Sequence, residues 1–247
     1  MSNDLDQNAP PLPRGLILLA SLWLIGSWIV TIGAQRPLQP SSASYTPGVR
    51  GMLLSLALGL VVAWPLVRLS RGVGPRAMRS VALDLVVLIA LIQVVVWPLR
   101  LVTPWGLART AAIDLALVAW TVLIGGVIVG FGALNGRGRT IGMVVCLVLV
   151  GSIPLLNGLM PMIDPVGVPS SVDLSAVAAR SSPFSLVHAI SGGGPQPIER
   201  PDLAALALAA SAAAAIWGVI AAGELIRAIR APRPSGRRNA TALDPQQ

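Results

Sequence analysis

The placement of arginine constrains this chain more than any other feature of its sequence. All 18 basic residues are Arg, and they lie around six long apolar stretches. Four Arg follow the second stretch, two lie in the short connection after the fourth, and five follow the sixth, whereas the other connections, which are mostly longer, hold two each. Because cytoplasmic loops of membrane proteins retain Arg and Lys, this alternation predicts a membrane topology. The clustered residues are Arg68, Arg71, Arg76 and Arg79, then Arg137 and Arg139, then Arg227, Arg230, Arg233, Arg237 and Arg238.

The composition agrees with a membrane protein. Only 11% of the 247 residues are charged and 54% are hydrophobic, with a mean hydropathy of +0.76. A soluble domain is about a quarter charged. The net charge of +8 is explained by the cytoplasmic loops, and no basic patch with interleaved aromatic residues is present. We therefore expect no nucleic-acid partner.

The apolar stretches predict an all-α membrane protein with a six-transmembrane-helix bundle. About 20 apolar residues cross a hydrocarbon core of ~30 Å. The charge count places both termini in the cytoplasm, and the absence of Lys points to a GC-rich bacterial genome, hence to the bacterial cytoplasmic (inner) membrane. The expected helices are residues 15–35, 51–67, 81–99, 110–135, 140–163 and 203–226.

Two tails flank the expected membrane domain of residues 15–228. Residues 1–14 are polar and Pro-rich, and residues 229–247 are basic, so both are predicted to be disordered. The first apolar run is long and its start is acidic, which favours a retained helix over a cleaved signal peptide.

The connection at residues 164–202 is the largest expected outer segment, and two short helices are predicted in it, at 172–180 and from Ser182 onward. The stretch at 154–163 is apolar but contains Pro and Gly, so we expect a broken segment that either crosses or dips back into the membrane. Small residues fill the last run and form Gly126-x-x-x-Gly130 in the fourth. Such faces serve packing within one bundle or, alternatively, a homodimer interface.

Three acidic residues lie in or next to the apolar runs. Asp84 and Asp114 each stand about one turn inside a helix N-terminus, where capping or pairing with a nearby Arg is the simpler interpretation and a transport pathway the alternative. The topology places these two carboxylates in opposite leaflets, so they form no catalytic pair. Glu224 precedes Arg227 by three residues, a spacing that predicts a surface ion pair.

The residues that carry catalysis are sparse. Cys146 and His188 are the only cysteine and histidine, and neither a Walker-type phosphate loop nor a nucleophile-elbow motif occurs. We therefore expect no enzyme, no cofactor and no metal site.

The arrangement resembles the permease subunits of ABC-2 type exporters. The resemblance rests on six helices with both ends inside, a length near 250 residues, the outer insertion before the last helix, and its Ser182-Pro183-Phe184 segment. The basic loop 68–80 stands where that family places its coupling helix. An amphipathic cytoplasmic helix usually precedes helix one in this family, and residues 1–14 are too short and Pro-rich for it.

The resemblance implies a role in moving lipid-like or amphipathic cargo across the membrane. The partners would be membrane lipids, a separate ATPase subunit and a second copy of the chain. Arg71, Arg76 and Arg79 are the residues expected to contact the ATPase. The alternative, equally consistent with the absence of motifs, is a non-catalytic scaffold or accessory subunit of a membrane complex. A membrane-embedded enzyme is a third hypothesis, and the lack of a cluster of polar residues argues against it.

Overall fold

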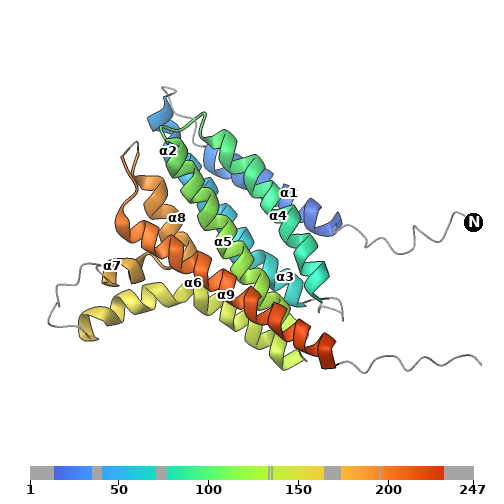
Figure 1. The fold of residues 1–247 in the computed structure, drawn as a ribbon. Coiled ribbons are helices and arrows are strands. Elements are labelled where there is room, and N and C mark those ends of the chain that lie inside the picture. The colour runs from blue at the N-terminus through green and yellow to red at the C-terminus, as the bar shows by residue number, and fades with distance from the viewer. Residues whose placement is uncertain are drawn as a thin grey trace, which may run out of the picture.

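The computed structural model describes residues 14–34, 41–70, 77–132, 134, 136–163, 174–194 and 196–230, with the side chains of 152–163, 174, 175, 228 and 230 left undescribed. All regular elements in this part of the chain are helical (Figure 1). They are α1 (Arg14–Trp28), η2 (Ile29–Gly33), α2 (Ser42–Leu58), η3 (Gly59–Ala63), α3 (Trp64–Ser70), α4 (Ala77–Leu99), α5 (Leu107–Gly132), α6 (Gly136–Ile163), α7 (Leu174–Ala179), α8 (Pro183–Gly192) and α9 (Arg200–Arg230).

Five helical segments among the described residues are long and apolar enough to cross a membrane: Arg14–Gly33, Ser42–Ser70, Ala77–Leu99, Leu107–Gly132 and Arg200–Arg227. These segments indicate a membrane-embedded protein. α6 is a further helix of 28 residues that is not among the five. The expected all-helical class is thus observed in the described chain.

α5 is the central helix of the bundle. It packs against α3, α4, α6, α8 and α9. Its small residues let neighbours approach closely, since a Cβ added at Gly126 would lie 2.6 Å from Cγ2 of Ile216 on α9. On α9, Ala205, Ala209 and Ala213 are buried at a spacing of four residues, which places them on one helix face. Gly126 therefore serves internal packing, whereas Gly130 faces open space.

A proline sits inside the segment formed by α2, η3 and α3. Pro65 has no amide proton, so it makes no α-helical hydrogen bond to the residue four before it. The five-residue π-helical turn η3 precedes it, and the amide of Trp64 donates to the carbonyl of Gly59. A π-turn inserted in an α-helix is frequent at functional sites. Here it brings Gly59, Leu60 and Ala63 to the lining of a pocket.

α1 is attached to α2 along only part of its length. The Trp23 indole Nε1 donates to the carbonyl of Ser55 at 3.0 Å, and the hydroxyls of Ser27 and Ser55 lie 2.7 Å apart. Farther along, a Cβ added at Gly48 would lie 2.7 Å from the carbonyl oxygen of Thr31. These contacts all involve the second half of α1 and η2.

Several boundaries differ from the expectations. Residues 36–51 were expected to form a loop, but α2 begins at Ser42 because Ser41 and Ser44 form a capping box. The basic loop 68–80 is shortened by helix at both ends, to Ser70 and from Ala77, and residues 71–76 lie outside the described residues. α6 is helical as far as Ile163, so the expected break at 154–163 is not observed in its backbone. Figure 1 shows that α6 bends away from the other helices.

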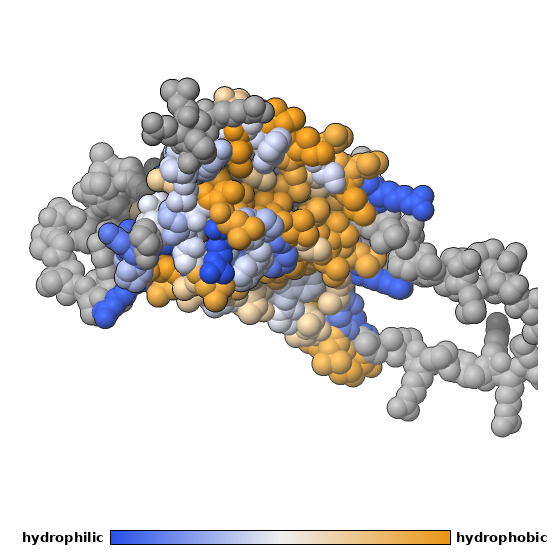
Figure 2. All heavy atoms as spheres, turned by 90° about the horizontal axis from the view of Figure 1, so that it is seen from above, coloured by the Kyte–Doolittle hydropathy of each residue, from blue (hydrophilic) through white to orange (hydrophobic). Residues whose placement is uncertain are grey.

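The bundle has two ends. At one, the α1 end, α1, α4 and α6 begin and α3, α5 and α9 finish (Figure 1). At the other, the α8 end, α2, α5 and α9 begin and α4 and α8 finish. Figure 2 shows a broad apolar face, with the strongly hydrophilic residues mostly toward its two ends. The expected tails at 1–14 and 229–247 lie almost entirely outside the described residues; the described parts, Arg14 and residues 229–230, are helical.

Candidate functional site

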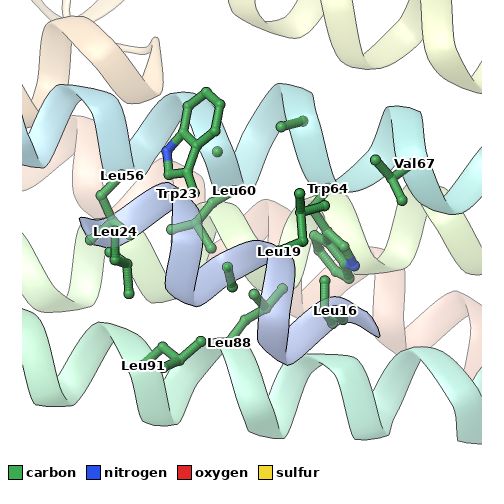
Figure 3. Close-up of a pocket in the computed structure, with 13 residues that line it drawn as sticks. Leu16, Leu19, Trp23, Leu24, Leu56, Leu60, Trp64, Val67, Leu88 and Leu91 are labelled. Atoms are coloured by element: carbon green, nitrogen blue, oxygen red, sulfur yellow. The ribbon is translucent and has the colours of Figure 1, made fainter. Parts of the chain in front are cut away.

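A hollow lies between α1, α3 and α4. Its first part is a partly open apolar cavity of about 170 Å³, lined by leucine side chains from α1, α2, η3 and α4 and flanked by Trp23 and Trp64 (Figure 3). Its second part is a cavity of about 360 Å³ nearer the α1 end, lined by Gly15, Leu16, Leu19, Leu22, Trp64, Val67, Arg68 and Asp84. The two parts share Leu16, Leu19, Trp64 and Val67, so they lie next to each other and are treated together as the hollow.

The hollow lies beside α1, which packs only loosely against the bundle, with Leu16, Ala20 and Leu24 reaching the core. The window of its membrane span is 6% buried, against 50% for the span formed by α2, η3 and α3. The hydrogen bonds to α2 start at Trp23, and Leu18 and Leu22 remain 65% and 68% exposed.

An ion pair closes the polar part of the hollow. Nε of Arg68 lies 2.9 Å from Oδ2 of Asp84, whose side chain is 3% exposed while that of Arg68 is 26% exposed. Trp64 and Arg68 stand four residues apart on α3, so both face α4. Asp84 therefore pairs with an Arg, as expected, but with one on another helix. Arg79, the neighbour on its own helix, is exposed, and the expected contact residues Arg71 and Arg76 lie outside the described residues.

Asp114 has a different partner from the one expected. Arg109 precedes it on the same helix, yet the amide Nε2 of Gln93 on α4 donates to both carboxylate oxygens at 3.0 Å. Nε1 of Trp97 in turn donates to Oε1 of Gln93 at 2.6 Å. Pairing with an Arg, one of the two structural roles expected for Asp114, is not what the structure shows, because Arg109 points to α8 instead. Among the described residues, Asp84 and Asp114 share no partner.

Arg109 holds the last turn of α8. It is 5% exposed and donates to the backbone carbonyls of Ile190, Gln196 at 2.7 Å and Pro197 at 3.5 Å. The last carbonyls of a helix have no intrahelical donor, so a cation is favoured there. A Cβ added at Gly193 would lie 2.5 Å from the guanidinium, which explains why glycine occupies that position.

Two further side chains hold the same helix end. Arg50 of α2 donates to the carbonyl of His188 at 3.2 Å and contacts its ring, and Trp105 donates to the carbonyl of Ser191 at 3.2 Å. At its other end, α8 begins with a capping box formed by Ser182 and Ser185. Its apolar residues Leu186, Val187 and Ile190 are fully buried, so α8 is sunk into the bundle.

A second ion-pair group lies at the α8 end. Arg180 donates to Oε2 of Glu199 at 2.8 Å and to Oδ1 of Asp202 at 2.9 Å. Burial acts to lower the pKa of Arg180, but pairing with the two carboxylates outweighs it and the pKa is raised. The guanidinium is therefore charged throughout the pH range of a folded protein. At the α1 end, Glu224 and Arg227 form the expected i,i+3 pair at 2.6 Å on an exposed surface.

Sequence reasoning missed Arg68, Trp64, Gln93 and Arg109 as partners. The four-residue spacing of Trp64 and Arg68 was the available signal for one site, since Asp84 stands at a similar depth on the next long helix. Arg109 carried no signal, because its acceptors are backbone carbonyls. Among the described residues, no group of three or more His, Cys, Asp or Glu side chains gathers in a way that holds a metal ion.

Comparison of the chain with protein-family models, with curated proteins and with solved structures finds no match. The fold and the hollow therefore define the class at the level of a helical, membrane-embedded protein. The finer assignment depends on the geometry of the site.

Proposed function

We propose that this chain is a multi-pass protein of the bacterial cytoplasmic membrane and the permease subunit of an ABC-type exporter, driven by a separate ATPase. In this proposal α6 completes a set of six spanning helices, and the α1 end faces the cytoplasm. The cluster of Arg at this end supports that orientation.

The observation that carries the proposal is the insertion between α6 and the last helix. α7 and α8 stand there, and α8 begins at the Ser182-Pro183-Phe184 segment on which the resemblance to ABC-2 permeases rests. α8 is buried against α2, α5 and α9. Because α8 packs against three helices, a movement of α8 would be passed to α2, α5 and α9, and through α5 to the centre of the bundle.

The hollow beside α1 supports lipid-like cargo. Most of its lining is apolar, and the charged side chains in it are those of Arg68 and Asp84. It lies beside α1, whose membrane span is the least buried of the five. Cargo that carries an acyl chain enters such a hollow sideways from the bilayer, without crossing a polar path.

The ATPase partner is tested by purification of the native protein in mild detergent. We expect an ATPase to co-purify, and the triple variant Arg71→Glu, Arg76→Glu, Arg79→Glu to lose it while the membrane protein stays monodisperse. The matched control is Arg233→Glu, Arg237→Glu, Arg238→Glu, which removes the same charge from the C-terminal tail. A stable wild-type protein that purifies without any ATPase refutes the permease proposal.

The alternative function is an accessory subunit of a membrane complex. The outward surface of α9 favours it, because only 22% of that span is buried and its exposed residues are mostly small, as at Ala212, Ala214 and Ala215. Small surfaces allow close approach of another helix in lipid. Loss of complex assembly, rather than loss of transport alone, in the triple Arg variant supports this alternative.

The orientation is tested by cysteine labelling. Cys146 is the only cysteine and is buried, so a Cys146→Ala background carries Ser80→Cys at the α1 end or Ala43→Cys at the α8 end. An impermeant maleimide added to intact cells is expected to label the second position and to spare the first. The reverse labelling contradicts the orientation.

A further inference from the structure

The polar part of the hollow presents one charge of each sign. Arg68 uses Nε to contact Asp84, and it makes no further hydrogen bond to a described residue. Oδ2 of Asp84 faces Arg68, and both side chains line the cavity of about 360 Å³. A purely anionic group placed here is repelled by the carboxylate of Asp84, and a purely cationic group is repelled by the guanidinium of Arg68. A group that carries both charges complements the pair.

The indole of Trp64 lies beside the same ion pair. Its side chain is 3% exposed, and its indole Nε1 is shut off from solvent and lies close enough to Asp84 to act on that carboxylate. Trp64 lines both parts of the hollow, and Figure 3 shows its ring at the end nearer Leu16 and Val67. The indole N–H therefore supports the carboxylate of Asp84, and the guanidinium of Arg68 is the donor left for an anionic group in the cavity.

The rest of the hollow suits a hydrocarbon chain. Its apolar part of about 170 Å³ exposes no polar surface and is partly open, so in a bilayer hydrocarbon fills it more favourably than water. The chain-sized path runs from Trp64 along α1 to Leu24, between η3 and α4. The polar part, with Arg68 and Asp84, thus lies next to the apolar part, in the same order as the head group and acyl chain of a lipid.

We infer that the hollow between α1, α3 and α4 binds one acyl chain of a zwitterionic phospholipid that carries a phosphate and a primary ammonium. The phosphate lies against the guanidinium of Arg68, on the side that faces the cavity. The ammonium donates to the carboxylate of Asp84. This inference rests on the membrane location in the proposed function and not on the ATPase partner.

The test uses the full-length protein in lipid nanodiscs with a phosphatidylethanolamine that carries a diazirine in its acyl chain. We expect cross-links concentrated in residues 16–24 and 56–67, and competition by unlabelled phosphatidylethanolamine that is about tenfold more effective than by phosphatidylglycerol. Cross-links spread evenly over the outward surfaces of α4 and α9 show annular lipid only and overturn the inference. Stronger competition by phosphatidylglycerol overturns the assignment of the head group.

Variants separate the tail from the head. Ala20→Leu fills the apolar part and is expected to reduce cross-linking about tenfold, whereas Ala215→Leu adds the same volume on an exposed face of α9 and leaves it unchanged. The pair Arg68→Gln, Asp84→Asn keeps the tail site but removes the preference for the zwitterion. Trp64→Phe keeps the ring and removes only the indole N–H beside Asp84, so it should weaken the same preference less. Equal cross-linking of both Leu variants refutes the tail site, while ATPase co-purification is unaffected by either result.

Discussion

The two ends of the bundle each hold an arginine among packed helices, but they use it differently. Arg109 at the α8 end is 5% exposed and donates to three backbone carbonyls, which lie on α8 and on the loop after it. Backbone carbonyls do not titrate, so these hydrogen bonds link the two segments at any pH. Arg68 at the α1 end faces a single carboxylate beside a cavity. The first arrangement fixes a helix, and the second leaves donors free for a ligand. A buried charge therefore indicates a binding site only where its protein partners leave some of its hydrogen-bond donors or acceptors unused.

Removal of the Arg109 guanidinium should have the largest effect. Arg109→Met keeps much of the packing volume but leaves the carbonyls at the end of α8 without donors. Hydrogen bonds to charged groups contribute about 1.5–3 kcal/mol each, so we expect a loss of about 3 kcal/mol or more. Thermal unfolding in detergent measures it.

The matched control is Arg100→Met, which removes an exposed charge at the same end. It is expected to leave the unfolding temperature within a degree or so of the wild type, since isolated surface charges contribute little. Equal losses for the two variants would mean that Arg109 does not hold α8.

Disruption of the Arg68–Asp84 pair should cost less. Asp84→Leu leaves a guanidinium without its partner, but Arg68 is partly exposed and opens to a cavity, so we expect about 2 kcal/mol, below the range for a fully buried pair. The double variant Arg68→Leu, Asp84→Leu should recover most of the stability, because no unpaired charge remains. A double variant that is less stable than either single one contradicts this account.

Glycine substitutions compare the rigidity of the two ends. Gly193→Ala brings a Cβ to 2.5 Å from the guanidinium of Arg109, which has no freedom to move, so we expect about 1–2 kcal/mol of destabilisation from overpacking. Gly59→Ala brings a Cβ to 2.9 Å from the indole Nε1 of Trp23, whose ring is 37% exposed but whose N–H donates to the carbonyl of Ser55. Because the exposed ring gives way at the cost of one weakened hydrogen bond, we expect a smaller loss for Gly59→Ala than for Gly193→Ala, and the opposite order would reverse the comparison.

The smallest effect is expected at the exposed Glu224–Arg227 pair. Glu224→Gln removes an ion pair whose side chains are 51% and 77% exposed. Such pairs contribute less than about 1 kcal/mol and are screened by salt. Unfolding measured at low and high ionic strength should show a small difference from the wild type that disappears at high salt. A loss as large as that of Asp84→Leu is not compatible with a surface pair.

The helices were predictable to a large extent, and their partners were not. Long apolar runs locate the helices, since the transfer of each residue into lipid adds to a sum along the chain. Their ends were misjudged at Ser42 and at Ala77, where capping and helix continuation outweighed the polar composition. The i,i+3 pair of Glu224 was predictable because both residues stand on one helix.

The candidate site itself required the tertiary structure. Asp84 was identified from sequence, but its partner Arg68 lies on another helix, and which helix faces meet depends on the rotation of each helix against its neighbours. Asp114 shows the same limit, since Gln93 of α4 replaced the expected Arg. The cavity has no sequence signature, because it depends on how closely α1 packs against the bundle.

The sequence by itself determined an all-helical chain with long apolar segments, arginine sorted between its connections, and short helices before the last long one. These properties follow from free energies that each residue contributes nearly independently, such as transfer into lipid and helix capping. Only the tertiary structure decided that Arg109 fixes α8 and that Arg68 and Asp84 face a hollow. Those outcomes depend on distances between residues far apart in the chain, which packing alone sets.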